Sequence, residues 1–367
     1  MILLVTQCFP PDPGGIETLM GGIATHLLPM AVLADRIRKG GAEWVDPPFA
    51  LRRFGGPKPL RRWRKARAIR QAVATGSVSA IIADSWKSLE LLPPTELPVA
   101  VLTYGTEFPQ HLTRRKRRRI KAALQRASCI IAISRFTADL VRPYVPAAPM
   151  VVINPPIPPQ PEPSVAARAQ VAQQVAGRGP VLLTLARLEP RKGIDQVIRA
   201  LPGLRAAHPD VLYLVAGGGE DAPRLRALAE AEGVADRVLF LGRVDDDTKA
   251  ALYRSADVFA MPNRREGNSV EGYGLVFVEA AWYGLPSLAG QDGGAGEAVV
   301  AGETGLLCDG ADSAAVEAAL KLLLSDAASR AEMGRKAREF ARGRCQWSAV
   351  APSFAATLWT RKVMVNQ

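Results

Sequence analysis

The sequence is poor in cysteine and has no long apolar run. Its cysteines, Cys8, Cys129, Cys308 and Cys345, lie far apart without a C-x-x-C spacing, which argues against a zinc site or a disulfide framework. No apolar run reaches the ~18 residues that a membrane-spanning helix needs, and the residues after Met1 lack the positive charge that opens a signal peptide. We therefore expect reduced, mostly buried thiols and a cytoplasmic chain that is not integral to a membrane.

Acidic residues are scarce in only one part of the chain. The net charge is +12, because residues 1–145 hold 23 Lys and Arg against 10 Asp and Glu, whereas the rest of the chain holds 24 against 25. At 367 residues, 48% of them apolar, the chain exceeds the usual size of a single domain. Two domains are therefore expected, with the excess positive charge on the first.

Apolar runs alternate with helix-length amphipathic segments along the chain. A proline-dense stretch at 154–164 interrupts the alternation, which restarts with apolar runs at 181–185, 212–216 and 258–261. Such runs are typical of parallel strands covered by helices, whereas the proline-dense stretch can be neither a central strand nor a helix interior. The pattern predicts an α/β protein with two domains of similar build joined by this linker.

Two glycine-rich turns follow predicted strands, at residues 10–17 and 217–220. Glycine lets the backbone approach a phosphate closely, and a helix start behind it presents free N–H groups and a positive dipole end. Neither turn fits the G-x-G-x-x-G pattern or the P-loop pattern, so a purely structural turn remains the alternative for each.

A cationic segment ends the predicted strand at 181–185 and runs directly into a helix. It supplies Arg187 and Lys192, five residues apart. Arg187 offers a bidentate fork and Lys192 a point charge, a combination that suits a diphosphate. The alternative is two solvated surface cations.

The strongest signal is a glycine turn followed by an apolar helix at 275–283. The N–H groups of Gly274, Leu275 and Val276 are expected to face a ligand phosphate. Glu279 is an acid within this apolar helix, and burying it unpaired would be costly, so it needs a partner such as ligand hydroxyls. The alternative is a structural carboxylate that neighbouring groups satisfy.

These segments together resemble a known family. Glu271 and Glu279, with seven residues between them, match the paired-glutamate motif of retaining GT-B glycosyltransferases of the fourth sequence family, glycosyltransferase group 1. Further stretches resemble that family in the same order along the chain, at 10–17, 186–193, 241–244, 293–297 and 303–307. Within the family, the chain looks most like bacterial phosphatidylinositol mannosyltransferases and related enzymes that glycosylate lipid or lipid-linked acceptors.

The resemblance implies a GT-B fold, two Rossmann-like domains whose parallel sheets face each other across a cleft. The N-terminal domain, 1–160, would bind the acceptor, and the C-terminal domain, 161–345, would bind the nucleotide-sugar donor. A C-terminal helix within 346–367 is expected to cross back to the first domain.

Carried over by position, the resemblance assigns roles to the motif residues. Arg187 and Lys192 would hold the donor diphosphate and stabilise it as the leaving group. Glu279 would bind the ribose hydroxyls, and Glu271 would face the transferred sugar. The other implied donor contacts are Gly14 and Gly15 over the phosphates, Arg243 and Val244 beside the nucleobase, and Gly274, Leu275 and Val276 at the phosphate or sugar.

The implied mechanism needs no metal, because no Asp-x-Asp pair is present to hold one between a strand and the diphosphate. It needs no cofactor either, because the nucleotide-diphosphate sugar is itself a substrate. The one aspartate cluster, 245–247, is a better helix cap than a metal site. Two cations and helix-end N–H groups can take up the charge of the leaving group instead. The family is believed to react on the donor's own face, with the leaving phosphate helping to deprotonate the acceptor, so no protein nucleophile is expected.

One position departs from the family pattern. Where many relatives have the histidine of an H-G-x-E-like stretch, this chain has Tyr104, followed by a glycine and, after one more residue, Glu107. Tyrosine can donate a hydrogen bond there but does not titrate near neutrality. Tyr104 therefore joins Glu271, Arg187 and Lys192 as a candidate catalytic residue whose acid or base role is open.

The excess positive charge gathers in two predicted helices, at 58–70 and 112–124. Basic helices with interspersed apolar residues suit an anionic membrane surface, to which each basic residue can contribute ~1 kcal/mol. A solvated charged face is the alternative, and no nucleic-acid-binding motif accompanies the charge. The expected membrane contacts are Arg61, Arg62, Trp63, Arg64, Lys65, Arg114, Arg115, Lys116, Arg117, Arg118 and Arg119.

The sequence thus predicts a retaining enzyme that moves a hexose from a GDP- or UDP-sugar to a lipid or lipid-linked acceptor. It would lie at the inner face of the cell membrane as a peripheral protein, with no nucleic acid as a partner. Two alternatives stay open: transfer to a soluble sugar or metabolite, and a non-catalytic protein that binds a nucleotide sugar or nucleic acid.

Overall fold

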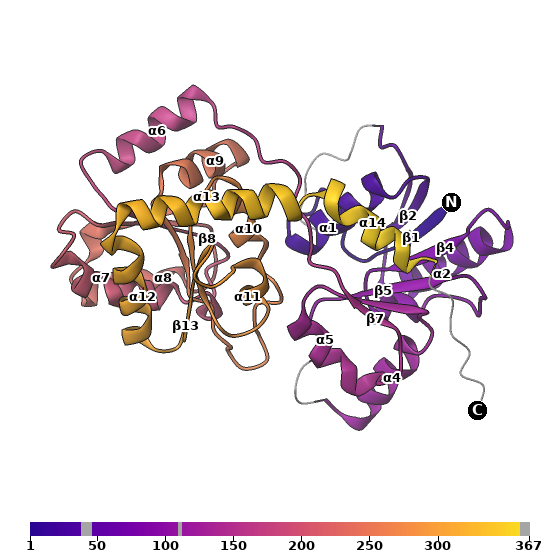
Figure 1. Ribbon diagram of the computed structural model, residues 1–367. Coiled ribbons are helices and arrows are strands. Elements are labelled where there is room, and N and C mark those ends of the chain that lie inside the picture. Colours follow the sequence, from indigo (N-terminus) through magenta and orange to yellow (C-terminus); the bar gives the residue numbers. More distant parts are fainter. Residues whose placement is uncertain (38–45, 109–111, 360–367) are drawn as a thin grey trace. The chain divides into compact units, whose positions relative to one another are not determined.

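The computed structural model describes residues 1–37, 46–108 and 112–359, which form two compact units (Figure 1). The N-terminal unit comprises Met1–Pro158 and the chain from Trp347 on, and the C-terminal unit comprises Pro159–Gln346. The first boundary lies within the proline-dense stretch of the sequence. No helix among the described residues is long and apolar enough to span a bilayer.

The N-terminal unit is built on a parallel sheet, with seven strands in its described part, in the order β3-β2-β1-β4-β5-β6-β7. Leu4 of the central strand lies opposite Val32 on one side and Ile82 on the other. All three side chains are fully buried, as apolar runs predict for strands covered on both faces. The strands are β1 (Ile2–Val5), β2 (Met30–Asp35), β3 (Ala50–Phe54), β4 (Ala80–Ala83), β5 (Val99–Thr103), β6 (Cys129–Ala132) and β7 (Met150–Val152).

Helices pack on this sheet, and several begin at the residue types that the sequence offers as caps. The Thr113 side chain accepts a hydrogen bond from the Lys116 amide at 3.3 Å and so caps α4. The last helix, α14, packs on α1, where the Trp347 ring stacks on His26 with 4.8 Å between ring centroids. The helices are α1 (Gly15–His26), α2 (Lys58–Ala74), α3 (Trp86–Leu89), α4 (Arg114–Leu124), α5 (Arg135–Val141) and α14 (Trp347–Thr357), with a 3₁₀ turn at Arg142–Tyr144.

The C-terminal unit repeats the design with a parallel sheet, of six strands in its described part, in the order β10-β9-β8-β11-β12-β13. Leu183 of the central strand β8 lies opposite Leu214 and Phe259. The predicted strands at 181–185, 212–216 and 258–261 are confirmed as β8, β9 and β11. The strands are β8 (Val181–Leu185), β9 (Leu212–Ala216), β10 (Val238–Gly242), β11 (Val258–Met261), β12 (Ser287–Gly290) and β13 (Gly305–Cys308).

The aspartate cluster does begin a helix in this unit: the Asp245 side chain accepts a hydrogen bond from the Thr248 amide at 2.7 Å and caps α9. The longest helix here, α13, packs against α10 (Figure 1). The helices are α6 (Val165–Val175), α7 (Ile194–Arg205), α8 (Ala222–Ala231), α9 (Asp246–Ser255), α10 (Leu275–Trp282), α11 (Ala295–Ala298), α12 (Ser313–Ser325) and α13 (Ala327–Arg344), with 3₁₀ turns at Pro190–Lys192 and Ala235–Arg237.

Both sheets reverse their strand order beside the first strand, between β1 and β4 in one unit and between β8 and β11 in the other. In open sheets of this kind, ligands bind outside the carboxyl ends of the strands at such a switch point. The loops that follow β8 and β11 are therefore the first place to look for a site.

Candidate functional site

The loops after β8 and β11 are pressed together at a glycine. Gly193 has a left-handed backbone, with φ of 71°, and a β-carbon there would lie 2.0 Å from the carbonyl oxygen of Pro262. A side chain would push the two loops apart. The Arg264 amide also donates to the Arg191 carbonyl at 2.9 Å. Residues on these two loops therefore face one another at the switch point.

An ion cluster joins the two loops. Glu271, from the loop after β11, accepts hydrogen bonds from Lys192 Nζ at 2.5 Å and from Arg191 Nη1 at 2.9 Å. Burial on its own would raise the pKa of Glu271, but these two cations outweigh burial and lower the pKa to about 2. For Lys192, burial lowers the pKa and the Glu271 carboxylate opposes that shift. The pair is thus ionised and largely buried.

Arg187 lies apart from Glu271 and belongs to the same loop as Lys192. Its side chain is 71% exposed and pairs with Glu189 at 2.6 Å. Glu189 also accepts from Arg191 Nε at 2.9 Å. Positive and negative side chains thus alternate from Arg187 through Glu189 and Arg191 to Glu271. Arg187 lies at the exposed end of this series, and the binding of a diphosphate by Arg187 and Lys192 stays a prediction.

The start of α10 has the geometry that the sequence predicts. Gly274 precedes the helix with a left-handed φ of 89°, and a β-carbon there would lie 2.6 Å from the Phe277 ring. The amides of Leu275 and Val276 stand in the first turn, where no partner exists within the helix. They can donate to an anion close to Glu271.

A second glycine turn packs against the backbone of Glu271. The Gly294 amide donates to the Glu271 carbonyl at 2.9 Å, and a β-carbon on Gly293 would come within 2.2 Å of the same oxygen. Gly293 also has a left-handed φ of 83°. The sequence motif at 293–297 is therefore explained by close backbone packing against the Glu271 loop.

Glu279 lies on α10, among side chains of α9. It accepts a hydrogen bond from the Tyr253 hydroxyl at 3.2 Å, and Lys249 Nζ lies 3.9 Å away. Burial raises the pKa of Glu279, although Lys249 and Tyr253 oppose the rise. Neighbouring side chains thus supply one hydrogen bond and one nearby cation to the Glu279 carboxylate. Its contact with ribose hydroxyls stays a prediction.

The predicted nucleobase residues follow β10. Arg243 is exposed, and its Nε lies 3.5 Å from the position of a β-carbon on Gly218. Val244 is partly buried just before the cap of α9. In the turn at 217–220, a β-carbon on Gly217 would lie 1.8 Å from the carbonyl oxygen of Ala186. Packing of the two loops is therefore sufficient to explain that glycine turn.

The remaining predicted site residues belong to the N-terminal unit. Gly14 and Gly15 are exposed at the start of α1, and Gly14 has a φ of 152°. Tyr104 follows β5, and its buried hydroxyl has no hydrogen-bond partner among the described residues. Its amide donates to Glu107 Oε1 at 2.8 Å. Burial raises the pKa of Glu107 to about 7, against the effect of this hydrogen bond.

The two basic helices form as expected, but one of their residues is not a surface residue. Lys65 of α2 is 1% exposed, and its Nζ donates to Asp35 Oδ1 and to the Thr6 carbonyl, both at 2.6 Å. The prediction that Lys65 contacts a membrane is therefore wrong. Sequence position suggested a surface cation, whereas Asp35 at the end of β2 draws this side chain inward. Arg61 also pairs with Asp35, at 3.1 Å.

The other basic residues lie outside the core. On α4, the predicted contacts from Arg114 to Arg119 are all exposed, and on α2 the same holds for Trp63 and Arg64. Glu90 accepts hydrogen bonds from Arg62 of α2 at 3.0 Å and from Arg119 of α4 at 2.7 Å. This acid therefore ties the two cationic helices together.

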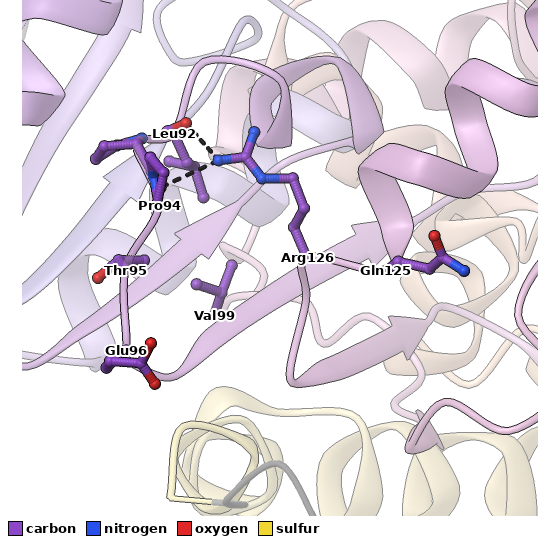
Figure 2. A pocket seen from close by; sticks show the side chains of 8 residues that line it. Leu92, Pro94, Thr95, Glu96, Val99, Gln125 and Arg126 are labelled. Carbon is purple, nitrogen blue, oxygen red and sulfur yellow. Dashed lines mark hydrogen bonds between the residues drawn. The ribbon is translucent and has the colours of Figure 1, made fainter. Parts of the chain in front are cut away.

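Two hollows in the N-terminal unit contain no residue of the donor motifs. One, of about 340 Å³, is lined by Thr113, Arg115, Lys116 and Arg119. The other, of about 260 Å³, lies beside Val99 (Figure 2). There Arg126 donates to the carbonyls of Leu92 and Pro93, so it stabilises a loop. Among the described residues, no three His, Cys, Asp or Glu side chains come together as metal ligands would.

Comparison with known proteins decides the family. Residues 13–161 match the family model described as Glycosyltransferase Family 4, and residues 167–340 match Glycosyl transferases group 1. The chain is 31% identical, over 98% of its length and 99% of the relative's, to a GDP-mannose-dependent alpha-(1-6)-phosphatidylinositol monomannoside mannosyltransferase of Mycolicibacterium smegmatis. The chain belongs to the group 1 glycosyltransferases.

Solved structures agree with this glycosyltransferase in fold. A sucrose-phosphate synthase from Thermosynechococcus elongatus matches with a TM-score of 0.77 and 21% identity, over 97% of this chain and 98% of the other. Anabaena HepE in complex with UDP matches with a TM-score of 0.78 and 22% identity, over 97% and 99%. The predicted fold class, two Rossmann-like domains of the GT-B type, is confirmed.

The sequence pattern did not single out Arg191, Glu189, Tyr253 or Lys249, although each contacts a predicted site residue in this glycosyltransferase. Arg191 is adjacent to Lys192, and the alternation of sign along residues 187–192 was a signal that this stretch forms ion pairs. The contacts of Tyr253 and Lys249 with Glu279 depend on the packing of α9 against α10, so no local sequence pattern predicts them.

Proposed function

We propose that this glycosyltransferase moves a hexose from a GDP- or UDP-sugar to a lipid or lipid-linked acceptor, with retention at the anomeric carbon and without a metal. The observation that carries the proposal is the cationic pair Lys192 and Arg191 against Glu271 at the switch point, directly beside the start of α10. A diphosphate needs cations beside it, and the sugar attached to it needs a hydrogen-bond acceptor such as the Glu271 carboxylate.

The donor half of the proposal follows from charge and shape. Lys192 and Arg187 stand on one loop, and the first amides of α10 lie close to Glu271, so positive groups converge where a diphosphate would bind. Glu279, farther along α10, would accept hydrogen bonds from the ribose, and Arg243 with Val244 would border the base. Anabaena HepE, of the same fold, was solved with UDP.

The chemistry assigned to these groups is stabilisation of the departing diphosphate. As the bond between the sugar and the phosphate breaks, Lys192, Arg187 and the α10 amides would offset the negative charge that develops. The acceptor hydroxyl would attack from the face that the phosphate leaves, and a phosphate oxygen would take its proton. Glu271 would orient the sugar, and the Tyr104 hydroxyl, which has no hydrogen-bond partner among the described residues, remains available as a donor.

The acceptor is proposed from the relatives and from the charge. The Mycolicibacterium smegmatis relative is named for a phosphatidylinositol glycolipid acceptor and for GDP-mannose as donor. Helix α4 exposes a run of cations from Arg114 to Arg119. Helix α2 exposes Leu60 and Trp63, at 48% and 55%. Cations beside an exposed tryptophan suit the headgroup region of an anionic membrane, here the inner face of the cell membrane.

A thermal-shift screen tests the donor half. GDP, UDP, ADP and their sugars are added separately, and a ligand at 100 times its dissociation constant stabilises the fold by ~2.7 kcal/mol. GDP or UDP and one of its hexose conjugates should raise the melting temperature, and the conjugate should be slowly hydrolysed. A chain that melts unchanged with every nucleotide contradicts the proposal. Binding without hydrolysis or transfer favours the non-catalytic alternative.

A further inference from the structure

The Glu271 carboxylate is held through only one of its oxygens. Lys192 Nζ and Arg191 Nη1 both donate to Oε2, at 2.5 and 2.9 Å. Oε1 accepts no hydrogen bond from the described residues. It is also not fully buried, because the fully buried side-chain atoms without a partner do not include it. One oxygen is thus anchored, and the other is open to solvent and to a ligand hydroxyl.

The two cations that anchor Glu271 differ in how firmly they are themselves fixed. The guanidinium group of Arg191 is fixed by two carboxylates, because its Nε donates to Glu189 at 2.9 Å and its Nη1 donates to Glu271 at 2.9 Å. Its carbonyl also accepts from the Arg264 amide at 2.9 Å. Lys192 makes a single side-chain contact with Glu271, through a flexible stem that can be redirected.

This inference rests on the proposed function, in which the donor diphosphate binds Lys192. A diphosphate brings negative charge to the cation that Glu271 now shares, so Lys192 is expected to turn toward the phosphates. We infer that Arg191 is a positioning residue: it holds the Glu271 carboxylate, with Oε1 facing the transferred sugar, while Lys192 is engaged by the diphosphate.

The charges around Glu271 agree with these separate roles of Arg191 and Lys192. The charged side chains that face Glu271 are Lys192 and Arg191, both from the turn after β8, whereas the turn at 293–294 contributes backbone only. Burial would raise the pKa of Glu271, and the two cations lower it to about 2. Without Arg191, and with Lys192 on the diphosphate, the carboxylate loses the charges that keep it ionised, and its pKa rises.

The test separates nucleotide binding from turnover in Arg191→Met. Affinity for GDP and UDP, measured by calorimetry, should stay within about threefold of the parent. The turnover number for donor hydrolysis should fall by about tenfold to a hundredfold, the loss expected for one charge-assisted hydrogen bond. The acid limb of the turnover profile should also move to higher pH. The matched control is Arg199→Met on α7, which breaks a partly exposed ion pair of 2.9 Å with Glu232, the residue that follows α8.

Two further variants keep the test decisive. Arg191→Lys restores the charge and should return the acid limb toward that of the parent, even where Arg191→Met folds poorly. In a Glu271→Gln background, Arg191→Met should have almost no further effect on turnover, because the residue acts through Glu271.

Four results would overturn the inference. Nucleotide affinity that falls as far as turnover would make Arg191 a ligand of the diphosphate. Losses that add in the double variant, or an acid limb that does not move, would separate Arg191 from Glu271. A parent chain that binds no nucleotide contradicts the proposed function itself, whereas a working parent with a parent-like Arg191→Met contradicts this inference alone.

Discussion

The two glutamates of the paired motif lie in opposite electrostatic surroundings. Two cations lower the pKa of Glu271 to about 2 against the effect of burial, whereas burial raises the pKa of Glu279 in spite of Lys249 and Tyr253. Pairs of acids whose environments separate their pKa values are often assigned different tasks. In the proposed function, Glu271 would meet the transferred sugar as a charged acceptor, and Glu279 would accept hydrogen bonds from the ribose hydroxyls.

Replacing each acid by its amide should reveal the two tasks. Glu279→Gln is expected to weaken binding of both the free nucleotide and the donor, because it acts through the ribose. Glu271→Gln is expected to lower turnover with less effect on nucleotide affinity, because it acts on the transferred sugar. Calorimetry with nucleotide and a hydrolysis assay measure the two effects. Parent-like behaviour in both variants would mean that the family roles do not extend to this chain.

Lys192→Ala and Arg187→Ala should each weaken nucleotide-diphosphate binding by about 1.5–3 kcal/mol, because each removes one charge-assisted contact. Melting temperature measured without ligand shows whether the fold is kept, and Arg199→Ala controls for the loss of a cation elsewhere. Undiminished diphosphate affinity in both variants would place the phosphates at another site.

Among the elements, the two basic helices carry the proposed contact with a membrane. Glu90 joins the two helices, because it accepts hydrogen bonds from Arg62 of α2 and from Arg119 of α4. Charges farther from a lipid surface than a Debye length of ~8 Å are screened at physiological ionic strength. Binding through this face should therefore weaken steeply as salt is raised.

Reversing Arg114, Arg115, Arg117 and Arg118 to Glu should abolish sedimentation with anionic vesicles and slow transfer to a lipid acceptor. Donor hydrolysis should survive, since none of the four belongs to a donor motif. The control reverses four exposed cations of the C-terminal unit, with the same change in net charge: Arg168, Arg205, Lys321 and Lys336. If the α4 variant still pellets as the parent does, the helix is only a solvated charged face.

Strands and helix starts were the parts of the fold that local pattern predicted best. Strands β8 and β11 match their apolar runs residue for residue, because a strand buried on both faces leaves a continuous apolar signature. Lys65 was assigned to the surface wrongly because its burial depends on Asp35, at the end of β2, and on Thr6, which follows β1, and both are far from Lys65 in the sequence. The family resemblance placed Arg187, Lys192 and Glu271 in one site, but the bridging of Glu271 by Arg191 could be found only in the folded loops.

The whole molecule consists of two Rossmann-like units that differ in charge, and we propose a different task for each. The C-terminal unit holds the donor motifs around Glu271, and the N-terminal unit holds the cationic helices together with Tyr104. We propose that this chain moves a hexose from a nucleotide sugar to a lipid.

Transfer to lipid tests that claim most directly. The full chain is incubated with GDP-mannose or a UDP-hexose labelled in the sugar, and with anionic vesicles that contain phosphatidylinositol or its mannosides, and the lipids are then extracted. Label is expected in the lipid fraction from one of these donors, and it should be strongly reduced in Glu271→Gln. A folded chain that binds nucleotide yet labels no lipid from any of these donors, or labels only a soluble acceptor, would contradict the proposed transfer to lipid.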